Sequence, residues 1–330
     1  MEVSALSGKK LIAFNEKEFA EKINPFNQKI IEEFLYQSEQ LSDKSIKQYR
    51  SSLRIFFTFV HDKLGNLPLY ELRPRDGLMY QNYMLRLGLS PNTIASKRYA
   101  VSSLCYYIEL YYDREYPDFR NIFSKAVPSI PAKPKKEKEP LTMDEFDKIV
   151  EYLEKKKDYQ KLAYLLFSYV SGARREEVRQ LRKEVVNYEK YVNKRGEQKN
   201  YYVTHKIRAK GRGKEGKIRQ FPFDDRVMEV FKKWLEVRGD DDNPYMFVSV
   251  RNGEHRQLHP NTFNYWCDGF SKIIGGKKVF PHLLRATRAT SSYEGGKDIK
   301  SIQSLLGHES SETTEIYIIQ DNDEDIDDLF

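Results

Sequence analysis

The chain has 330 residues and a formal net charge of +7. That length exceeds what one compact core usually holds, so we expect two domains. The last ten residues hold five Asp, one Glu and no basic residue, which makes the preceding chain more basic still. Such a body favours a polyanionic partner, and nucleic acid is preferred to a membrane because no amphipathic anchor or lipidation signal is visible.

Cysteine usage and hydropathy indicate the cellular compartment in which the protein works. Cys105 and Cys267 each lie in an apolar-rich stretch, so buried free thiols and a reducing cytosol are expected rather than a disulfide framework. The longest uncharged apolar run, 162–172, is 11 residues long and is too short to span a bilayer. We therefore expect a cytoplasmic, nucleoid-associated protein without a membrane partner.

Four helical patterns follow an N-terminal arm of about 25 residues without a strong pattern. They cover residues 27–37, 42–64, 74–87 and 90–108. Ser42 and Ser90 are placed to cap the second and fourth helices, and Pro91 occupies a first helical position. The pattern predicts a small all-helical domain over residues 1–126.

Basic side chains follow the polar faces of the second and fourth of these helices. They are Lys44, Lys47, Arg50, Arg54, Lys97 and Arg98. A solvated face explains any one of them, and together they give the predicted helical domain a basic surface; its role as a DNA contact is implied only by the family resemblance described below.

Residues 127–140 contain four prolines and four lysines. Proline disfavours continued helix, so this segment is interpreted as an interdomain linker. Lys133, Lys135 and Lys136 are candidate DNA contacts within it, although a plain spacer explains each lysine equally well.

The second half mixes helices with a few strands. Thr142 is placed to cap a helix with an acidic first turn, residues 159–169 form a helix that is apolar nearly all round, and Gly172 ends it. Strands are predicted at 201–204 and 217–223, and further helices at 226–237 and 262–274. The predicted fold class is mainly α with a small β-sheet or hairpin.

A basic, glycine-rich segment between the two strands carries Lys210, Arg212 and Lys214, and Arg212 and Lys214 are candidate DNA contacts. Its glycines predict the end of a hairpin, and the spacing of a nucleotide-binding P-loop is absent. His255 and His259 have a spacing that metal pairs use, yet Pro260 interrupts the helix that such a pair requires. No metal and no other cofactor is expected.

Five short motifs then follow one another along the chain. They are Ser171-Gly172-x-Arg174 with Glu177, Lys210-Gly211, His282-x-x-Arg285 with Thr287, Ala289 and Thr290, Leu305-Leu306-Gly307-His308, and Thr313-Thr314-x-x-Tyr317. In this order and spacing the chain resembles the tyrosine recombinases, the phage-integrase and Xer-like family of DNA strand exchangers. The resemblance covers residues 141–317, while residues 1–126 agree only in helical layout.

The resemblance implies an organisation for the whole chain. Residues 1–126 would be a helical, SAM-like core-binding domain, 127–140 a basic linker, 141–320 an α+β catalytic domain, and 321–330 an acidic tail. Family members work as tetramers on double-stranded DNA, and a C-terminal segment docks on the neighbouring protomer. The same partners are expected here.

The resemblance also implies roles for individual residues. Tyr317 would attack a DNA phosphate to leave a 3′-phosphotyrosine, while Arg174 and Arg285 clamp the phosphate and His308 donates a further hydrogen bond. His282 would accept the tyrosine proton, and Lys210 would protonate the leaving 5′ oxygen, with Lys214 as the reserve candidate.

Two positions depart from the family pattern. Ala286 stands where a basic residue or His is usual. Arg288 stands where an apolar residue is common, so it is a candidate DNA contact.

The predicted function is site-specific recombination for a phage or another mobile element. The alternative is a regulator, such as a phage repressor, that kept this fold and lost strand exchange, because binding needs only the basic surface. A type IB topoisomerase, which shares the chemistry, is a further alternative.

Overall fold

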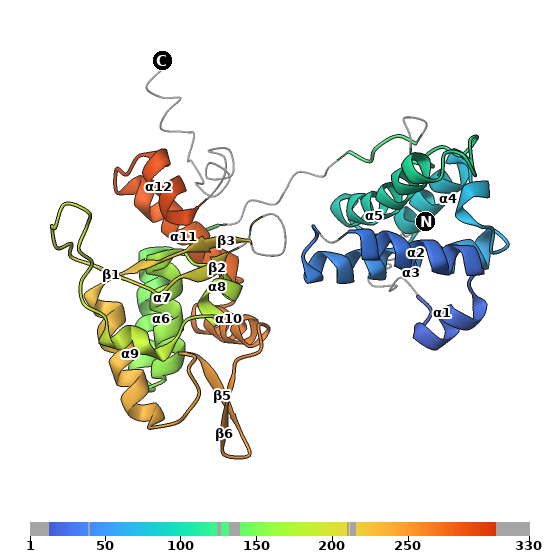
Figure 1. Ribbon diagram of the computed structural model, residues 1–330. Coiled ribbons are helices and arrows are strands. Elements are labelled where there is room, and N and C mark those ends of the chain that lie inside the picture. The colour runs from blue at the N-terminus through green and yellow to red at the C-terminus, as the bar shows by residue number, and fades with distance from the viewer. Residues whose placement is uncertain are drawn as a thin grey trace, which may run out of the picture. The chain divides into compact units, whose positions relative to one another are not determined.

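The computed structural model describes residues 13–38, 40–123, 127–131, 139–209, 211 and 216–307. The chain divides into two compact units, one built mainly from residues 1–135 and the other mainly from 136–330. Figure 1 shows the helices and strands of both units. Each unit has its own hydrophobic core.

The described residues of the first unit form helices and the turns between them. The elements are α1 (Glu16–Lys22), α2 (Pro25–Gln37), α3 (Asp43–Lys63), the 3-10 helix η1 (Leu69–Glu71), α4 (Pro74–Arg86) and α5 (Pro91–Tyr111). Ser42 and Ser90 cap α3 and α5 through their side-chain oxygens, as the sequence predicts. Helix α1 begins inside the segment expected to be an arm, where Asn15 and Glu18 form a capping box.

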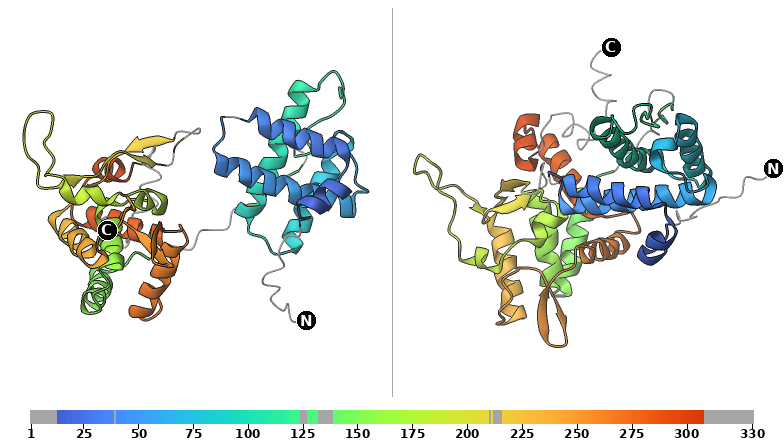
Figure 2. Two further views of the ribbon diagram at one scale, coloured as in Figure 1. Left: turned by 60° about the horizontal axis from the view of Figure 1, so that its bottom comes forward. Right: turned by 45° about the vertical axis from the view of Figure 1, so that its right-hand side comes forward.

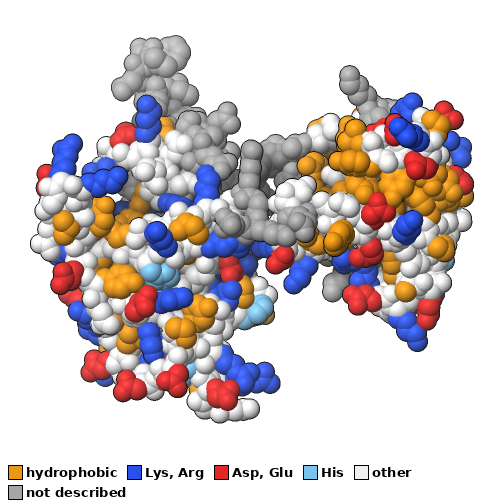
Figure 3. All heavy atoms as spheres, viewed as in Figure 1, with side chains coloured by type: hydrophobic (Ala, Val, Ile, Leu, Met, Phe, Trp, Pro, Cys, Tyr) orange, Lys and Arg blue, Asp and Glu red, His pale blue; other side chains and the backbone are white. Residues whose placement is uncertain are grey.

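Helices α3 and α5 pack against each other in this unit and supply much of its core. Phe56, Phe57, Leu104 and Ile108 are fully buried there. Hydrophobic side chains also gather on the surface of this unit (Figure 3). The exposed ones on α2 and α5 are Tyr36, Tyr99, Tyr106, Leu110 and Tyr111.

The second unit combines helices with three two-stranded antiparallel sheets in its described residues. Its helices are α6 (Met143–Lys155), α7 (Tyr159–Ser171), α8 (Arg175–Arg179), the 3-10 helix η2 (Lys183–Asn187), α9 (Asp225–Arg238), α10 (Thr262–Ile273), α11 (Pro281–Glu294) and α12 (Ile299–Leu306). The strands are β1 (Tyr202–Val203), β2 (Ile207–Ala209), β3 (Lys217–Arg219), β4 (Pro222–Phe223), β5 (Val248–Arg251) and β6 (Glu254–Gln257).

Helix α7 is the centre of the second unit, and α6, α9 and α11 pack around it (Figure 1). Nine of its residues are buried, which agrees with the apolar sequence on every side of this helix. The Ile and Phe residues from 217 to 223 predict one strand, but the structure divides this stretch into β3, which pairs with β2, and β4, which pairs with β1. The β5–β6 hairpin, absent from the predicted elements, projects from the unit in Figure 1 and in the right view of Figure 2.

Each unit holds one buried free cysteine, as expected from the apolar surroundings of both residues in the sequence. Cys105 lies in the first unit and Cys267 in the second, and both are 0 % exposed. Burial raises the pKa of each thiol to about 12, so neither is a thiolate at neutral pH.

Candidate active site

The side chain of Arg285 lies where two helices end. Arg285 belongs to α11 and is 1 % exposed. Its Nη1 donates to the carbonyl of Gly172, the C-cap of α7, and its Nη2 donates to the carbonyl of Leu306, the last residue of α12, at 2.7 Å. The carbonyl end of a helix carries partial negative charge, so both helices stabilise the buried guanidinium.

Two glycines with left-handed backbone allow these helix ends to meet. Gly172 has φ 60° and Gly307 has φ 65°. A Cβ on Gly172 would lie 2.6 Å from Leu306 Cδ2, and a Cβ on Gly307 would lie 2.4 Å from Arg219 Cζ. Both positions therefore favour glycine for conformation, and a Cβ at either one would displace the side chain that it meets.

Arg174 is fixed by Glu177, three residues further along the chain. Arg174 is the N-cap of α8, its backbone N–H donates to Glu177 Oε2 at 2.6 Å, and its Nη1 donates to Glu177 Oε1 at 3.1 Å. The side chain of Arg174 is 22 % exposed, whereas that of Glu177 is 2 % exposed. The Arg-x-x-Glu spacing thus folds into a capping box that orients the guanidinium and leaves part of it accessible.

Arg219 is a third arginine of this cluster, to which the sequence assigned no role beyond a strand position. Its Nη1 donates to the Leu306 carbonyl at 2.7 Å and its Nη2 to the Leu305 carbonyl at 2.7 Å. The Leu306 carbonyl therefore accepts from both Arg219 and Arg285. Burial lowers the pKa of Arg219, the negative charge of Glu177 raises it and the positive charge of Arg174 lowers it.

The β2–β3 hairpin is attached to α8 at its base. Arg208 pairs with Ile218 in the register of the two strands. Gln180, the C-cap of α8, donates from Nε2 to the Arg208 carbonyl at 2.9 Å and accepts from the Arg208 N–H at 3.2 Å. The hairpin strand that Lys210 follows in the sequence is thus connected to α8, the helix that Arg174 caps.

The structure describes part of the predicted catalytic set. Arg174 and Arg285 belong to the cluster, and His282 is exposed in the first turn of α11, three residues before Arg285. Lys210, His308 and Tyr317 lie outside the described residues. In the chain, Lys210 follows the last residue of β2 directly, and His308 follows Gly307.

Several predicted DNA contacts also lie outside the described residues. They are Lys133, Lys135, Lys136, Arg212 and Lys214. Arg288 is described, and its guanidinium lies 5.6 Å from the centroid of the Tyr169 ring. That position gives Arg288 a cation–π contact inside the second unit.

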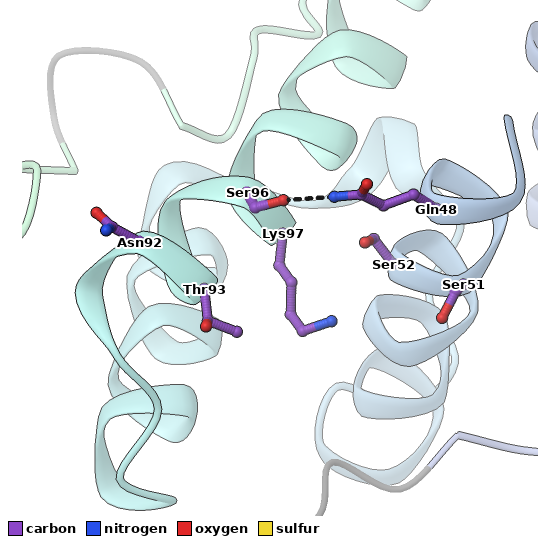
Figure 4. Close-up of a pocket in the computed structure, with 7 residues that line it drawn as sticks. All are labelled: Gln48, Ser51, Ser52, Asn92, Thr93, Ser96 and Lys97. Carbon is purple, nitrogen blue, oxygen red and sulfur yellow. Dashed lines mark hydrogen bonds between the residues drawn. The ribbon is translucent and has the colours of Figure 1, made fainter. Parts of the chain in front are cut away.

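In the first unit, a polar cavity of about 390 Å³ lies between α3 and α5 (Figure 4). The lining residues are Gln48, Ser51, Ser52, Asn92, Thr93, Ser96 and Lys97. Gln48 Nε2 donates to Ser96 Oγ at 2.9 Å, and the Lys97 side chain extends into the space between the helices (Figure 4). Burial lowers the pKa of Lys97, and an anionic or acceptor-rich ligand would supply the partner that its ammonium group favours.

Of the other predicted DNA contacts of this unit, the lysines are exposed and the arginines form hydrogen bonds within the unit. Lys44 and Lys47 are exposed on α3. Arg54 donates to the Phe14 carbonyl at 2.7 Å and thereby holds the segment before α1. Arg98 donates to the carbonyls of Val127 and Pro128 at 3.1 and 3.0 Å, so the structure shows this arginine fastening the chain that leaves the unit.

The fold is that of the tyrosine recombinases, a class of DNA strand-transfer enzymes. Residues 139–324 match the phage integrase family. The recombinase-like protein YomM of Bacillus subtilis (strain 168), derived from the SPbeta prophage, is 32 % identical over 94 % of this chain and 92 % of its own. The tyrosine recombinase XerA of Pyrococcus horikoshii is 32 % identical over 88 % and 89 %.

Solved structures agree on the fold. The Tn1549 transposon integrase in complex with circular intermediate DNA superposes with a TM-score of 0.68 at 18 % identity, covering 92 % of this chain and 98 % of that one. A lambda integrase tetramer bound to a Holliday junction gives a TM-score of 0.59 at 17 % identity, with 88 % and 77 % covered.

The chain belongs to the phage integrase family. It is a tyrosine recombinase, a DNA strand transferase, and the predicted family, fold class and enzyme class are confirmed. Within the residues that the structure describes, no helix is both long enough and apolar enough to cross a membrane.

Proposed function

We propose that this recombinase cleaves and rejoins duplex DNA one strand at a time, through a 3′-phosphotyrosine formed by Tyr317. The observation that carries the proposal is the arginine cluster of Arg174, Arg219 and Arg285 at the joined ends of α7 and α12. The cluster combines three guanidiniums with one carboxylate, that of Glu177. Its charge is therefore suited to binding an anion. A DNA phosphate is the anion that the basic chain favours.

Charge stabilisation is divided between an accessible arginine and a buried one. Arg174, which is 22 % exposed, makes the first contact with a non-bridging oxygen. Arg285, at 1 % exposure, reaches the phosphate when the surrounding chain opens on DNA binding. Both guanidiniums are oriented in advance by protein acceptors, so little reorganisation accompanies the change of charge in the transition state.

Proton transfer completes the step. Tyr317 Oη forms a bond to phosphorus as the bond to the 5′ oxygen breaks, His282 accepts the tyrosine proton, and Lys210 donates a proton to the 5′ oxygen. His308 donates a hydrogen bond to the phosphate. The phosphotyrosine conserves the bond energy, so rejoining requires the reverse reaction and no external energy source.

The two units then have distinct tasks. Residues 1–126 form the core-binding domain, which grips DNA through Lys44, Lys47 and the Lys97 cavity. The linker 127–140, the catalytic domain 141–320 and the tail 321–330 complete the chain. Four copies assemble on two DNA sites. The lambda integrase tetramer bound to a Holliday junction supports the number of copies. The prophage origin of YomM and the transposon origin of the Tn1549 integrase support a role in the movement of a mobile element.

A suicide substrate tests the proposal. DNA carrying a nick beside the cleavage site loses a short fragment after attack, which traps the covalent complex. We expect the wild type and Tyr265→Phe, a matched change at a tyrosine that is 72 % exposed, to form an adduct on denaturing gels, and Tyr317→Phe to form none.

The candidate DNA is the repeats that flank the gene. Tight binding by wild type without any adduct would contradict strand exchange and support the regulator. Relaxation of supercoiled plasmid without sequence preference would support the topoisomerase instead.

A further inference from the structure

The hydrogen bonds of Arg219 join two segments that are far apart in the sequence. Arg219 lies on β3, and its Nη groups donate to the carbonyls of Leu305 and Leu306 at 2.7 Å. A third contact reaches the Ser304 carbonyl at 3.4 Å. The last carbonyls of a helix have no partner within that helix, so Arg219 acts as a side-chain cap on the C-terminus of α12.

Several features make this cap rigid. The Gly307 Cα approaches so closely that any Cβ there would lie within 3 Å of the Arg219 guanidinium. The Arg219 guanidinium also packs 4.9 Å from the centroid of the Phe221 ring. On the opposite side of the hairpin, Gln180 holds both backbone groups of Arg208. The base of the β2–β3 hairpin is therefore fastened to α12 by Arg219 and to α8 by Gln180.

This inference rests on the proposed function. We infer that Arg219 is a positioning residue that holds the β2–β3 hairpin against the end of α12. In this position of the hairpin, Lys210 can donate a proton to the leaving 5′ oxygen. Arg219 pairs with Ile207 in register, and two residues further along β2 is Ala209, which Lys210 follows directly. A shift of β3 away from α12 therefore shifts the attachment point of Lys210. Proton transfer is sensitive to such a shift because it requires hydrogen-bond distance.

A sulfur-substituted substrate tests this inference. In DNA with sulfur in place of the scissile 5′ oxygen, Tyr317 Oη still bonds to phosphorus, but a thiolate leaves that needs no proton. We expect Arg219→Met to slow adduct formation on ordinary DNA roughly 10- to 100-fold, within the range of a general-acid effect. On the sulfur substrate, the same variant is expected to react within about 3-fold of wild type.

Three further variants serve as controls for the comparison of ordinary DNA with the sulfur substrate. Arg226→Met changes an exposed arginine of α9 and is expected to behave as wild type on both substrates. Arg219→Lys keeps the charge with fewer directed donors, and is expected to recover part of the rate on ordinary DNA. Lys210→Ala is expected to show the same sulfur rescue as Arg219→Met, and it is the reference for loss of the proton donor.

Each failure has a distinct signature. Absence of any wild-type adduct overturns the proposed function itself. Equal loss by Arg219→Met on both substrates, or no loss on either, overturns the positioning role while leaving strand exchange intact. Absence of sulfur rescue in Lys210→Ala overturns the proton-donor assignment and this inference with it. If Arg219→Met does not fold, judged by tryptophan fluorescence, Arg219→Lys is decisive under the same criteria.

Discussion

Glu177 sets how much positive charge the arginine cluster presents. Its carboxylate is buried, and it accepts from both the backbone and the guanidinium of Arg174. Arg219 and Arg285 are instead held by main-chain carbonyls. A carbonyl orients a guanidinium without cancelling its charge, so the site combines fixed geometry with an excess of positive charge.

Replacement of Glu177 separates these two contributions. In Glu177→Gln the neutral amide leaves the cluster more positive but supplies one acceptor oxygen where the carboxylate supplied two. We expect a loss of about 1–3 kcal/mol in the free energy of unfolding of the second unit, because a buried charged hydrogen bond is removed. Cleavage is expected to fall by more than DNA binding, since Arg174 loses its orientation.

Urea unfolding followed by tryptophan fluorescence measures the stability change, because Trp234 and Trp266 are the only tryptophans and both lie in the second unit. Glu176→Gln, an exposed neighbour on the same helix, is the control. An unchanged cleavage rate in Glu177→Gln would contradict the orienting role.

The sequence predicts the role of a single residue when its hydrogen-bond partner is near in the chain. The spacing of Arg174 and Glu177 is visible as a motif because both belong to one capping box. Arg219 has no such signal, since its acceptors are carbonyls 85 to 87 residues further along. Any residue type supplies a carbonyl, so the sequence carries no mark of that partner.

The C-terminal ends of helices α7 and α12 form the site around Arg285. Each ends in a glycine with positive φ, and the two ends share contacts with Arg285. Leu306 is 0 % exposed and packs where a Gly172 side chain would stand. The position of α12 is thus determined by the absence of a side chain on α7.

Gly172→Ala tests this dependence. We expect a loss of about 1–3 kcal/mol from backbone strain and a further ~1–3 kcal/mol from overpacking against Leu306, with little residual cleavage. Gly253→Ala is the matched control, because Gly253 has φ 79° but nothing within 4 Å of its added Cβ. Equal destabilisation by the two changes, measured by urea unfolding, would show that strain alone acts at Gly172.

Helices with side-chain caps are well predicted from this sequence. Ser42, Ser90 and Thr142 each cap a helix at the expected residue, because a cap is a local interaction. The short elements α1, β2 and the β5–β6 hairpin were not predicted. Strands of three or four residues are too short for a periodic pattern, and their pairing partners determine them.

For the whole molecule, the proposed DNA contacts of the first unit predict a salt effect. Replacing Lys44 and Lys47 together by Gln removes two phosphate contacts, so the slope of log K against log salt concentration should become less steep by about 2. Fluorescence anisotropy of the full chain on labelled duplex DNA measures the slope. Gln at both Lys232 and Lys233, exposed on α9, is the matched control, and an equal change in the two double variants would contradict a specific role of α3.

The placement of Cys105 and Cys267 gives this protein a built-in reporter. Each half encloses a single sulfhydryl that solvent does not reach, so an alkylating reagent modifies it only during a transient opening of that half. Peptide mass distinguishes the two modified positions. Transient opening of the first unit and of the second unit can thus be timed separately in one unaltered polypeptide, with and without DNA.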